Sequence, residues 1–365
     1  MKRKKVGIIG LGKITQIKHL HYLFHAEEFQ IEAICDISTS LLNSIGELYG
    51  VEKRFTNYHE MFKLDLDVVM VLTHDHATPI IDALNAGFHV FTEKPLCWTE
   101  EEAEKIQSIV KQTNNKLIIG YMKRYIPNYS DFKDRVQRLE NKKIINIKTF
   151  ASGTKFRIPY SHKTIKDSSL KPLEKDVNSD IITRIMRNMS YSQQRAEDYR
   201  MLMELGIHNL NFILDIFGEP VDINYVNMWS SRTENKAFNK NNVKNHRMFI
   251  TILTFASGLK CVWEIGAFFD GELDWKDTIT INDFNEEITL KFPNPFVRGL
   301  PIEINSEKII EGTPVKSSEI CFYEDSFKAE LQHLFACLEG NEIPKTSVIE
   351  GTRDIKWIKK IIDFI

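Results

Sequence analysis

Apolar residues in the first third of the chain occur as short runs, separated by stretches in which they recur every three or four positions. The short runs are typical of buried parallel strands, and the longer spacing is typical of amphipathic helices. This pattern predicts strands at residues 5–9, 31–35, 67–72, 88–92 and 116–120, and helices at about 13–24, 38–49, 77–86 and 100–113. Such alternation predicts an α/β fold with a doubly wound parallel sheet.

The pattern changes after Tyr125. A helix near 127–139 and a strand at 143–151 are followed by a polar stretch, a helix at about 196–217 and several alternating strands. Clear strands are 249–255, 260–265 and 278–281, with Ser257-Gly258 as a hairpin turn, and a last helix is expected at about 349–363. We predict a doubly wound domain at 1–123 and, at 124–365, a domain of α+β class with a large, mostly antiparallel open sheet and helices on one face.

The polar stretch at residues 152–200 carries ten Lys and Arg against six Asp and Glu, and it shows few helix signals before Ile181. Long irregular segments in compact proteins are usually functional or disordered. We therefore expect this stretch to be irregular, as a mobile cover over the substrate or as an arm between subunits.

The first predicted strand ends in closely spaced glycines, Gly10 and Gly12, and a helical pattern follows. This order of strand, glycine turn and helix is the context of a dinucleotide-binding fingerprint. Gly10 permits the tight turn, and Gly12 lets the backbone approach a pyrophosphate at the positive end of the helix. The third position is Thr15 instead of Gly or Ala, so we expect less close packing of helix and strand.

The second predicted strand ends in Asp36, 24 residues after Gly12. This is near the spacing of about 20 residues expected for an acid that binds the cofactor ribose. A carboxylate there accepts hydrogen bonds from both ribose hydroxyls and repels a 2′-phosphate, and no Arg or Lys follows until Lys53. NAD is therefore favoured over NADP. The alternative for Asp36 is a cap of the loop at Ser38.

Length and composition are those of an ordinary soluble protein with two domains: 365 residues, 42% hydrophobic and 27% charged. The formal charge of −2 gives no reason to expect nucleic acid or an anionic membrane as partner, and no segment approaches the ~20 apolar residues of a membrane span. The basic start is followed by a short, glycine-rich run unlike a signal peptide. The five cysteines are scattered without disulfide or zinc spacing, so we expect a cytoplasmic location.

The predicted helix at 196–217 carries a narrow polar seam. At 100° per residue the seam falls within an arc of roughly 80°, and most of the remaining positions are apolar. Its members are Arg200, Glu204, His208, Asn211 and Asp215. Surface helices have a broad polar face, so we expect this helix to be buried between layers and to touch a wet cleft. His208 can take a hydroxyl proton near neutral pH, with Glu204 one turn earlier to orient it; the alternative is a core histidine.

Lys94 follows the predicted strand at 88–92, at the edge where doubly wound sheets bind ligands, and Pro95 favours an extended conformation before it. Together with other motifs, this segment resembles the glucose-fructose oxidoreductase/inositol dehydrogenase (Gfo/Idh/MocA) family. The matching motifs are 6–15 with Asp36, 67–76, 86–90 with Glu93-Lys94-Pro95, 120–125, 206–210, 323–327 and 343–347. The resemblance spans essentially the whole chain and implies NAD(P)-linked oxidation or reduction of sugars and polyols.

The resemblance also implies roles for individual residues. Lys94 would bind the reacting oxygen, and His208 and Glu204 complete the expected catalytic set. Expected cofactor contacts are Gly10, Gly12, Lys13, Ile14, Asp36, Thr73, His74, His76, Glu93 and Lys94. Expected substrate contacts are Lys123, Arg124 and Asn211, with an ordinary solvated turn as the alternative for the first two. A solvated lysine is the alternative for Lys94.

Two segments depart from the family pattern. Residues 73–78 read Thr-His-Asp-His-Ala-Thr where the family often has Thr-Pro-Asn-x-x-His, and the substrate helix has Glu204 and Asn211 where the family often has Asp. His74 and His76, with Glu204 and His208, would also suit a metal ion. However, the two side chains of a His-x-His pair on a strand point to opposite faces, so we expect no metal.

These observations predict an NAD-dependent dehydrogenase or reductase that acts on a secondary hydroxyl of a sugar, polyol or related compound, as a homodimer or homotetramer. Two alternatives stay open. The first is a non-catalytic NAD-binding regulator, against which the presence of both Lys94 and His208 argues. The second is NAD-dependent glycoside cleavage, in which transient oxidation acidifies a neighbouring C–H bond.

Overall fold

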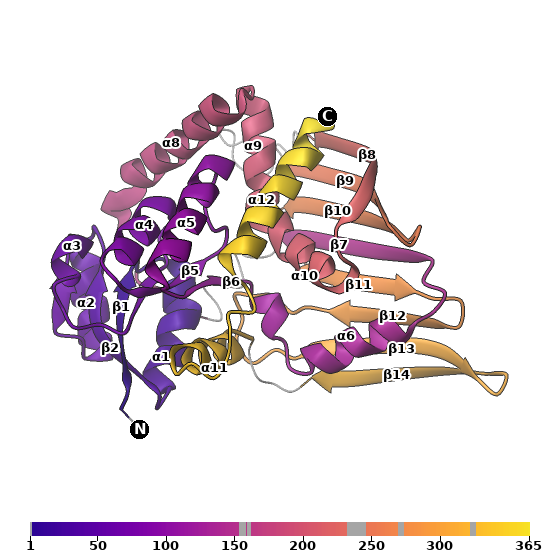
Figure 1. The fold of residues 1–365 in the computed structure, drawn as a ribbon, viewed down its shortest axis with the longest axis horizontal. Coiled ribbons are helices and arrows are strands. Elements are labelled where there is room, and N and C mark those ends of the chain that lie inside the picture. Colours follow the sequence, from indigo (N-terminus) through magenta and orange to yellow (C-terminus); the bar gives the residue numbers. More distant parts are fainter. Residues whose placement is uncertain (1, 153–157, 159–161, 232–245, 269–273, 322–325) are drawn as a thin grey trace, which may run out of the picture. The chain divides into compact units, whose positions relative to one another are not determined.

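The computed structural model describes residues 2–152, 158, 162–231, 246–268, 274–321 and 326–365. The chain divides into two compact units, each assembled from three separate segments. The first unit holds residues 1–125, 163–207 and 326–358, and the second holds 126–162, 208–325 and 359–365. Each unit has its own sheet (Figure 1).

The first unit is built on a six-stranded parallel sheet with the order β3-β2-β1-β4-β5-β6. Its strands are β1 (Lys4–Ile9), β2 (Phe29–Cys35), β3 (Lys53–Phe55), β4 (Val68–Val71), β5 (His89–Glu93) and β6 (Leu117–Gly120). This is the order of a doubly wound sheet, in which the crossover direction reverses between β1 and β4. Only β3 is absent from the predicted strands, because three residues are too few to show a period.

Helices cover this sheet, and every residue of β4 and β6 is buried. The helices are α1 (Leu20–His25), α2 (Thr39–Tyr49), α3 (Tyr58–Met61), α4 (Ala77–Asn85), α5 (Glu100–Thr113) and α11 (Ser326–Leu338). The Ser38 hydroxyl caps the first turn of α2, and a capping box between Thr99 and Glu102 begins α5. On one face, α1, α2 and α11 share a hydrophobic cluster with Val6 and Ile8 of β1.

Much of the polar stretch at 152–200 is helical, so the prediction of an irregular segment is wrong there. The structure has η3 (Ser168–Leu170), α8 (Lys171–Met189) and α9 (Gln193–Met201). The apolar stripe of α8 is narrow, because Ile181 and Ile185 are the only buried residues among the side chains of this helix that the structure describes. Arg184 pairs with Asp75 and with Glu102 of α5, beside which α8 lies (Figure 1). Tertiary contacts therefore hold a helix that its own pattern does not predict.

The second unit is built on an eight-stranded sheet with the order β14-β13-β12-β11-β7-β10-β9-β8. Its strands are β7 (Ile144–Ser152), β8 (Pro220–Ser231), β9 (His246–Phe255), β10 (Lys260–Phe268), β11 (Lys276–Asn282), β12 (Glu286–Lys291), β13 (Ile302–Ile310) and β14 (Thr313–Cys321). All neighbouring pairs are antiparallel except β7 with β10. Gly258, at φ 81°, lies in the predicted turn between β9 and β10. The predicted fold class is confirmed.

Helices α6 (Tyr129–Arg138) and α10 (Ile207–Phe217) pack on one face of this second sheet (Figure 1). Phe212 of α10 is fully buried, and its ring contacts the rings of Tyr129, Phe132 and Phe292. Asn209 donates a hydrogen bond to the hydroxyl of Thr149 in β7 at 2.6 Å. The last helix is α12 (Val348–Asp363), as predicted.

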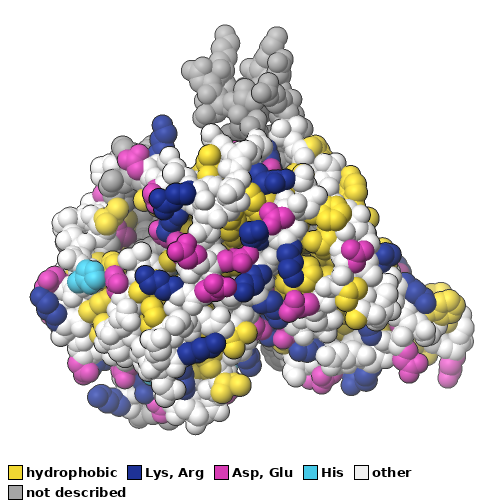
Figure 2. All heavy atoms as spheres, turned by 45° about the horizontal axis from the view of Figure 1, so that its top comes forward, with side chains coloured by type: hydrophobic (Ala, Val, Ile, Leu, Met, Phe, Trp, Pro, Cys, Tyr) yellow, Lys and Arg dark blue, Asp and Glu magenta, His cyan; other side chains and the backbone are white. Residues whose placement is uncertain are grey.

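Charges of both signs are mixed on the surface that Figure 2 shows, where Lys and Arg side chains are interspersed with Asp and Glu. Among the side chains that the figure colours, no extended block of one sign stands out. Among the helices that the structure describes, none has the length and apolar character needed to cross a membrane.

Truncation of Phe212 to alanine should destabilise the second unit, because it removes a buried ring from contact with three other rings. Losses of this kind lower the free energy of unfolding by about 3–5 kcal/mol. Phe284→Ala is the matched control: Phe284 is 78% exposed, and its truncation should change stability by about 0.5 kcal/mol or less. Urea unfolding, monitored by tryptophan fluorescence, gives the midpoint of each variant. Equal midpoints for Phe212→Ala and Phe284→Ala would contradict the role of Phe212 in the core.

Candidate functional site

The candidate site lies at the carboxyl edge of the parallel sheet in the first unit. Because all six strands run in one direction, the loops after β1, β2, β4 and β5 leave at this edge. Gly10 follows β1 with a φ of 95°, which favours glycine. A Cβ at Gly10 would lie 2.8 Å from the backbone carbon and oxygen of Leu72 and 2.9 Å from the nitrogen of Thr73. Glycine at this position therefore allows the backbone of the turn after β1 to approach the backbone of the loop after β4 closely.

The next part of the glycine turn is open. A Cβ on Gly12 would meet no atom within 4 Å, so the backbone there is accessible to a ligand. Thr15 is fully buried, and its hydroxyl donates a hydrogen bond to the carbonyl of Gly10 at 3.0 Å. It begins the π-helical turn η1 (Thr15–His19), so the helix starts with a wider turn than the periodicity predicts. Between Gly12 and Thr15, the side chain of Lys13 is exposed and that of Ile14 is half-buried.

Asp36 connects the glycine turn to the start of α2. Its Oδ2 accepts a hydrogen bond from the Leu11 N–H at 2.7 Å, and its Oδ1 accepts one from the Ser38 N–H at 2.9 Å. The first contact puts the half-buried carboxylate where a ribose-binding acid is expected. The second is the loop cap that the sequence leaves as an alternative. The two uses of Asp36 are therefore compatible.

Lys94 follows Glu93 at the end of β5 and is joined to Pro95 by a cis peptide bond. Its Nζ donates a hydrogen bond to the carbonyl oxygen of Glu204 at 2.8 Å. Glu204 lies in a second π-helical turn, η4 (Leu202–Gly206), between α9 and α10. Burial lowers the pKa of the Lys94 ammonium. Its proton is therefore easier to share with a neighbouring oxygen than that of an ordinary lysine.

A buried histidine–carboxylate pair supports the backbone of Lys94. Glu93 Oε1 and His19 Nε2 are 2.8 Å apart, and Glu93 Oε2 accepts a hydrogen bond from the Lys94 N–H at 3.2 Å. Burial acts to raise the pKa of Glu93, but the hydrogen bond with His19 and the neighbouring positive charges, including that of Lys94, together hold that pKa below its ordinary value. Glu93 is thus an anion that ties the end of β5 to η1.

His76 supports the same segment from the loop after β4. Its Nδ1–H donates a hydrogen bond to the carbonyl oxygen of Pro95 at 2.5 Å, and the side chain is only 2% exposed. Burial lowers the pKa of His76, so the imidazole is neutral at pH 7. The structure thus gives His76 a contact with the lysine segment that the sequence does not indicate.

The rest of the loop after β4 contacts α8. His74 Nε2 lies 2.8 Å from Asn178 Oδ1, and Asp75 pairs with Arg184 at 2.8 Å. Thr73 donates its hydroxyl hydrogen to the carbonyl of Asp75 at 2.6 Å. Sequence analysis missed Asn178 and Arg184, and no local signal identifies them, because the contacts join residues 104 and 109 positions apart. Across the described residues, no three His, Cys, Asp or Glu side chains gather as ligands for a metal.

The predicted helix at 196–217 is divided by η4 into α9 and α10. The π-turn changes the angular step, so a constant 100° per residue does not describe its polar seam. Arg200 donates a hydrogen bond to Asn178 Oδ1 at 2.9 Å and lies 3.6 Å from Glu204 Oε1. His208 is half-buried and Asn211 is fully buried, and both belong to the second unit.

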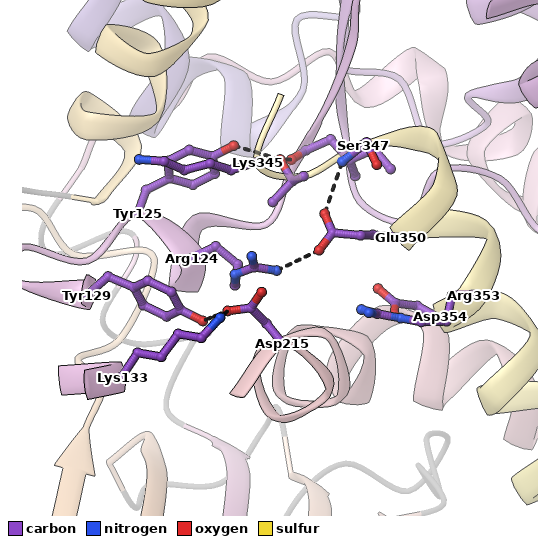
Figure 3. Close-up of polar contacts among 12 residues, drawn as sticks. Arg124, Tyr125, Tyr129, Lys133, Asp215, Lys345, Ser347, Glu350, Arg353 and Asp354 are labelled. Atoms are coloured by element: carbon purple, nitrogen blue, oxygen red, sulfur yellow. Dashed lines mark hydrogen bonds and ion pairs between the residues drawn. The ribbon is translucent and has the colours of Figure 1, made fainter. Parts of the chain in front are cut away.

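Lys123 and Arg124 lie in the short turn η2 (Met122–Tyr125) and are only 2% and 7% exposed. Arg124 pairs with Glu350 near the start of α12 at 3.0 Å (Figure 3). A substrate group at Arg124 would therefore share the guanidinium with Glu350. Within the second unit, Asp215 of the seam pairs with Lys133 at 2.9 Å (Figure 3).

Residues 4–121 match the family described as "Oxidoreductase family, NAD-binding Rossmann fold". Inositol 2-dehydrogenase of Salmonella typhimurium is 30% identical over 136 residues, which are 36% of this chain and 40% of that protein. The scyllo-inositol 2-dehydrogenase (NAD(+)) of Bacillus subtilis is 26% identical over 149 residues, 40% of this chain and 44% of that protein. The matches thus span about two fifths of the length of these relatives.

Solved structures resemble the whole chain. UDP-N-acetylglucosamine 3-dehydrogenase from Acidithiobacillus ferrooxidans has a TM-score of 0.69 at 17% identity and covers 99% of this chain and 96% of its own. A 3-ketoreductase from Actinomadura kijaniata, in complex with NADP and TDP-benzene, has a TM-score of 0.71 at 14% identity, over 98% of this chain and 96% of its own. At these identities the likeness shows the fold alone.

The parallel sheet, its glycine turn and the acid after β2 define the first unit as an NAD-binding Rossmann fold. Residues 4–121 match the Gfo/Idh/MocA oxidoreductase family. For these residues the resemblance seen in the sequence is confirmed.

Alanine substitutions at the two glycines should separate folding from ligand binding. Gly10→Ala places a Cβ against Leu72 at a positive φ, and we expect it to destabilise the protein by more than about 1 kcal/mol. Gly12→Ala has room, so it should unfold at the parent temperature while weakening the binding of a dinucleotide that approaches this backbone. Thermal unfolding measures the stability of each variant, and calorimetric titration measures its affinity for NAD. Unchanged stability of Gly10→Ala, or unchanged NAD binding by Gly12→Ala, would refute the corresponding assignment.

Proposed function

We propose that this protein is an NAD(P)-dependent oxidoreductase, which transfers a hydride between nicotinamide and a secondary hydroxyl or keto carbon of a sugar, polyol or related compound. The observation that carries this proposal is the Lys94 ammonium at the carboxyl edge of the Rossmann sheet, hydrogen-bonded to the Glu204 carbonyl. A cation there stabilises negative charge that develops on an oxygen. The names of the relatives, inositol 2-dehydrogenase and scyllo-inositol 2-dehydrogenase, support this class of reaction.

We propose NAD as the cofactor, with NADP less favoured, bound by residues 1–123. The open backbone at Gly12 fits a pyrophosphate, and the Asp36 carboxylate beside the glycine turn fits a ribose. Lys53, the first Lys or Arg after Asp36 in the chain, pairs with Glu32. The proposed contacts are Gly10, Gly12, Lys13, Ile14, Asp36, Thr73, His74, His76, Glu93 and Lys94. Nicotinamide, when bound, accepts or donates the hydride.

The proposed chemistry assigns one task to each polar group. Lys94 holds the substrate oxygen, and its lowered pKa favours sharing of a proton with that oxygen. His208 takes the hydroxyl proton while the hydride leaves the same carbon, and Glu204 orients His208 or a substrate hydroxyl. Lys123, Arg124 and Asn211 are the proposed substrate contacts, and residues 124–365 supply most of the substrate side.

We infer a cytoplasmic location. The structure describes Cys35, Cys97, Cys261 and Cys337 as free thiols, and all four are buried. Thiols of this kind are typical of a reducing compartment.

The catalytic assignment is tested on whichever substrate a screen of polyols and ketosugars yields, followed by absorbance of the reduced nicotinamide. His208→Ala should lower the rate by roughly 10²–10⁴-fold, and Lys94→Ala should lower turnover by roughly 10²–10³-fold. The double variant should lose less than the product of the two factors, because both groups serve one event. Neither change should greatly weaken NAD binding, because that binding depends mainly on Gly10, Gly12 and Asp36 rather than on Lys94.

The exposed His59 and Lys63 provide matched controls, and alanine at either position should leave the rate unchanged. Normal turnover of His208→Ala would show that the acid–base assignment is wrong. If no substrate is found and both site variants still bind NAD and a protein partner like the parent, a regulator is the better description. Release of a glycone from a glycoside would instead favour redox-assisted cleavage.

The second sheet supports assembly into a homodimer or homotetramer. Its face away from α6 and α10 carries apolar side chains from β8, β9 and β10, because alternate residues of a strand point to opposite faces. On β8, Tyr225 and Trp229 are 44% and 42% exposed, and Ile250, Ile252 and Val262 beside them are half-buried. A sheet face of this kind is a liability unless it is covered.

Light scattering at low micromolar concentration should therefore give the mass of a dimer or tetramer, and Trp229→Glu should shift it toward the monomer. Phe284→Glu, at an exposed aromatic outside this face, should not. A parent protein that is monomeric would count against assembly, and an unchanged mass for Trp229→Glu would count against this face.

A further inference from the structure

Residues 163–170 run past the glycine turn of the first unit. The side-chain amide of Gln16 donates a hydrogen bond to the carbonyl of Ile165 at 3.0 Å, and its Oε1 accepts one from the Ile165 N–H at 2.8 Å. The same amide nitrogen donates to the carbonyl of Leu11 at 2.8 Å, and Ile165 packs against the hydrophobic cluster of the unit. The segment is therefore fixed directly beside the turn that the dinucleotide fingerprint predicts.

Two residues further on, this segment brings a second carboxylate to the start of α2. Asp167 Oδ2 accepts a hydrogen bond from the Ser38 hydroxyl at 2.6 Å. Asp167 Oδ1 accepts hydrogen bonds from the backbone N–H of Ser169 at 2.9 Å and from its hydroxyl at 2.5 Å. Hydrogen bonds from Ser169 and Ser38 hold the pKa of Asp167 below its ordinary value, so the group is an anion at neutral pH.

Ser38 thus lies between two carboxylates. Its N–H donates to Asp36, and its hydroxyl donates to Asp167. In a Rossmann fold the acid after the second strand contacts the ribose 2′-hydroxyl, and an NADP enzyme accommodates the 2′-phosphate at the same place. A phosphate carries close to two negative charges at pH 7. At Ser38 it would compete with Asp167 for the hydroxyl donor and face two anions.

We propose that Asp167 is a second specificity-determining carboxylate, which acts with Asp36 at the adenosine ribose to exclude a 2′-phosphate. This inference rests on the proposed binding of a nicotinamide dinucleotide. It has a direct consequence for redesign: Asp36→Ser with Ile37→Arg removes only one of the two anions. Full acceptance of NADP requires Asp167→Asn as well.

Calorimetric titration with NAD and with NADP tests this proposal on the full chain. Asp167→Asn keeps the shape and the acceptor oxygen but removes the charge, so the ratio of NADP to NAD affinity should rise on the order of tenfold. The triple variant should favour NADP more than Asp36→Ser/Ile37→Arg alone. Asp176→Asn, at an exposed acid of α8, is the matched control and should leave the ratio unchanged.

A second measurement does not depend on any variant. Repulsion between charges is screened by salt, so the preference of the parent protein for NAD should weaken as ionic strength rises.

A further variant tests whether the segment attracts the 2′-phosphate instead of repelling it. Lys166 is exposed and adjacent to Asp167, so a positive charge at this position could bind the phosphate, and Lys166→Ala removes that charge. Thermal unfolding of each variant confirms that it is folded before titration.

The outcomes separate this inference from the function on which it rests. Equal changes in NAD and NADP affinity for Asp167→Asn would overturn it, because Asp167 would then be an anchor of the segment only. Selective loss of NADP binding in Lys166→Ala would also overturn it, because the segment would then attract the phosphate. A parent protein that binds neither dinucleotide would instead overturn the proposed function.

Discussion

The close approach of Gly10 to the backbone of Leu72 and Thr73 is the contact on which the candidate site depends. β1 and β4 are neighbours in the sheet, and the crossovers reverse direction between them, which is the place where doubly wound sheets bind ligands. Only a residue without a Cβ, and at ease with a φ of 95°, lets the two loops meet there. The Asp36 carboxylate then reaches the same turn through the N–H of Leu11. An edge built in this way presents backbone and carboxylate groups together, as a dinucleotide requires.

Two π-helical turns give this edge its remaining polar contacts. In η1, buried Thr15 donates its hydroxyl hydrogen back to Gly10, and His19 reaches Glu93. In η4, the carbonyl of Glu204 accepts a hydrogen bond from the Lys94 ammonium. A partly buried ammonium needs such a partner, because burial without one is costly. Single π-turns within helices often occur at functional sites, and here both contact the edge where the proposed chemistry takes place.

Residues 163–207 return to the first unit and complete its edge. Contacts between this segment and the loops and helices around the sheet join residues 82 to 149 positions apart. They include the Arg184 pairs with Asp75 and Glu102, which hold α8 in place. The groups that would surround a cofactor therefore come from two distant parts of the chain. A reading of the Rossmann motif alone finds one acidic group at Ser38, whereas the folded chain places two there.

The sequence by itself determined most of the order of strands and helices in the first 125 residues, the class of each sheet and the residues at the ends of β1, β2 and β5. It did so because buried strands, amphipathic helices and glycine turns leave local periods and local residue preferences. The expectation that Gly10, Asp36 and Lys94 share one edge followed from parallel strands alone. Only the tertiary structure decided that α8 is a helix, since Ile181 and Ile185 leave too narrow an apolar stripe. The contact of Asp167 with Ser38 was likewise decided by folding, because a hydrogen bond across 129 positions leaves no local trace in the sequence.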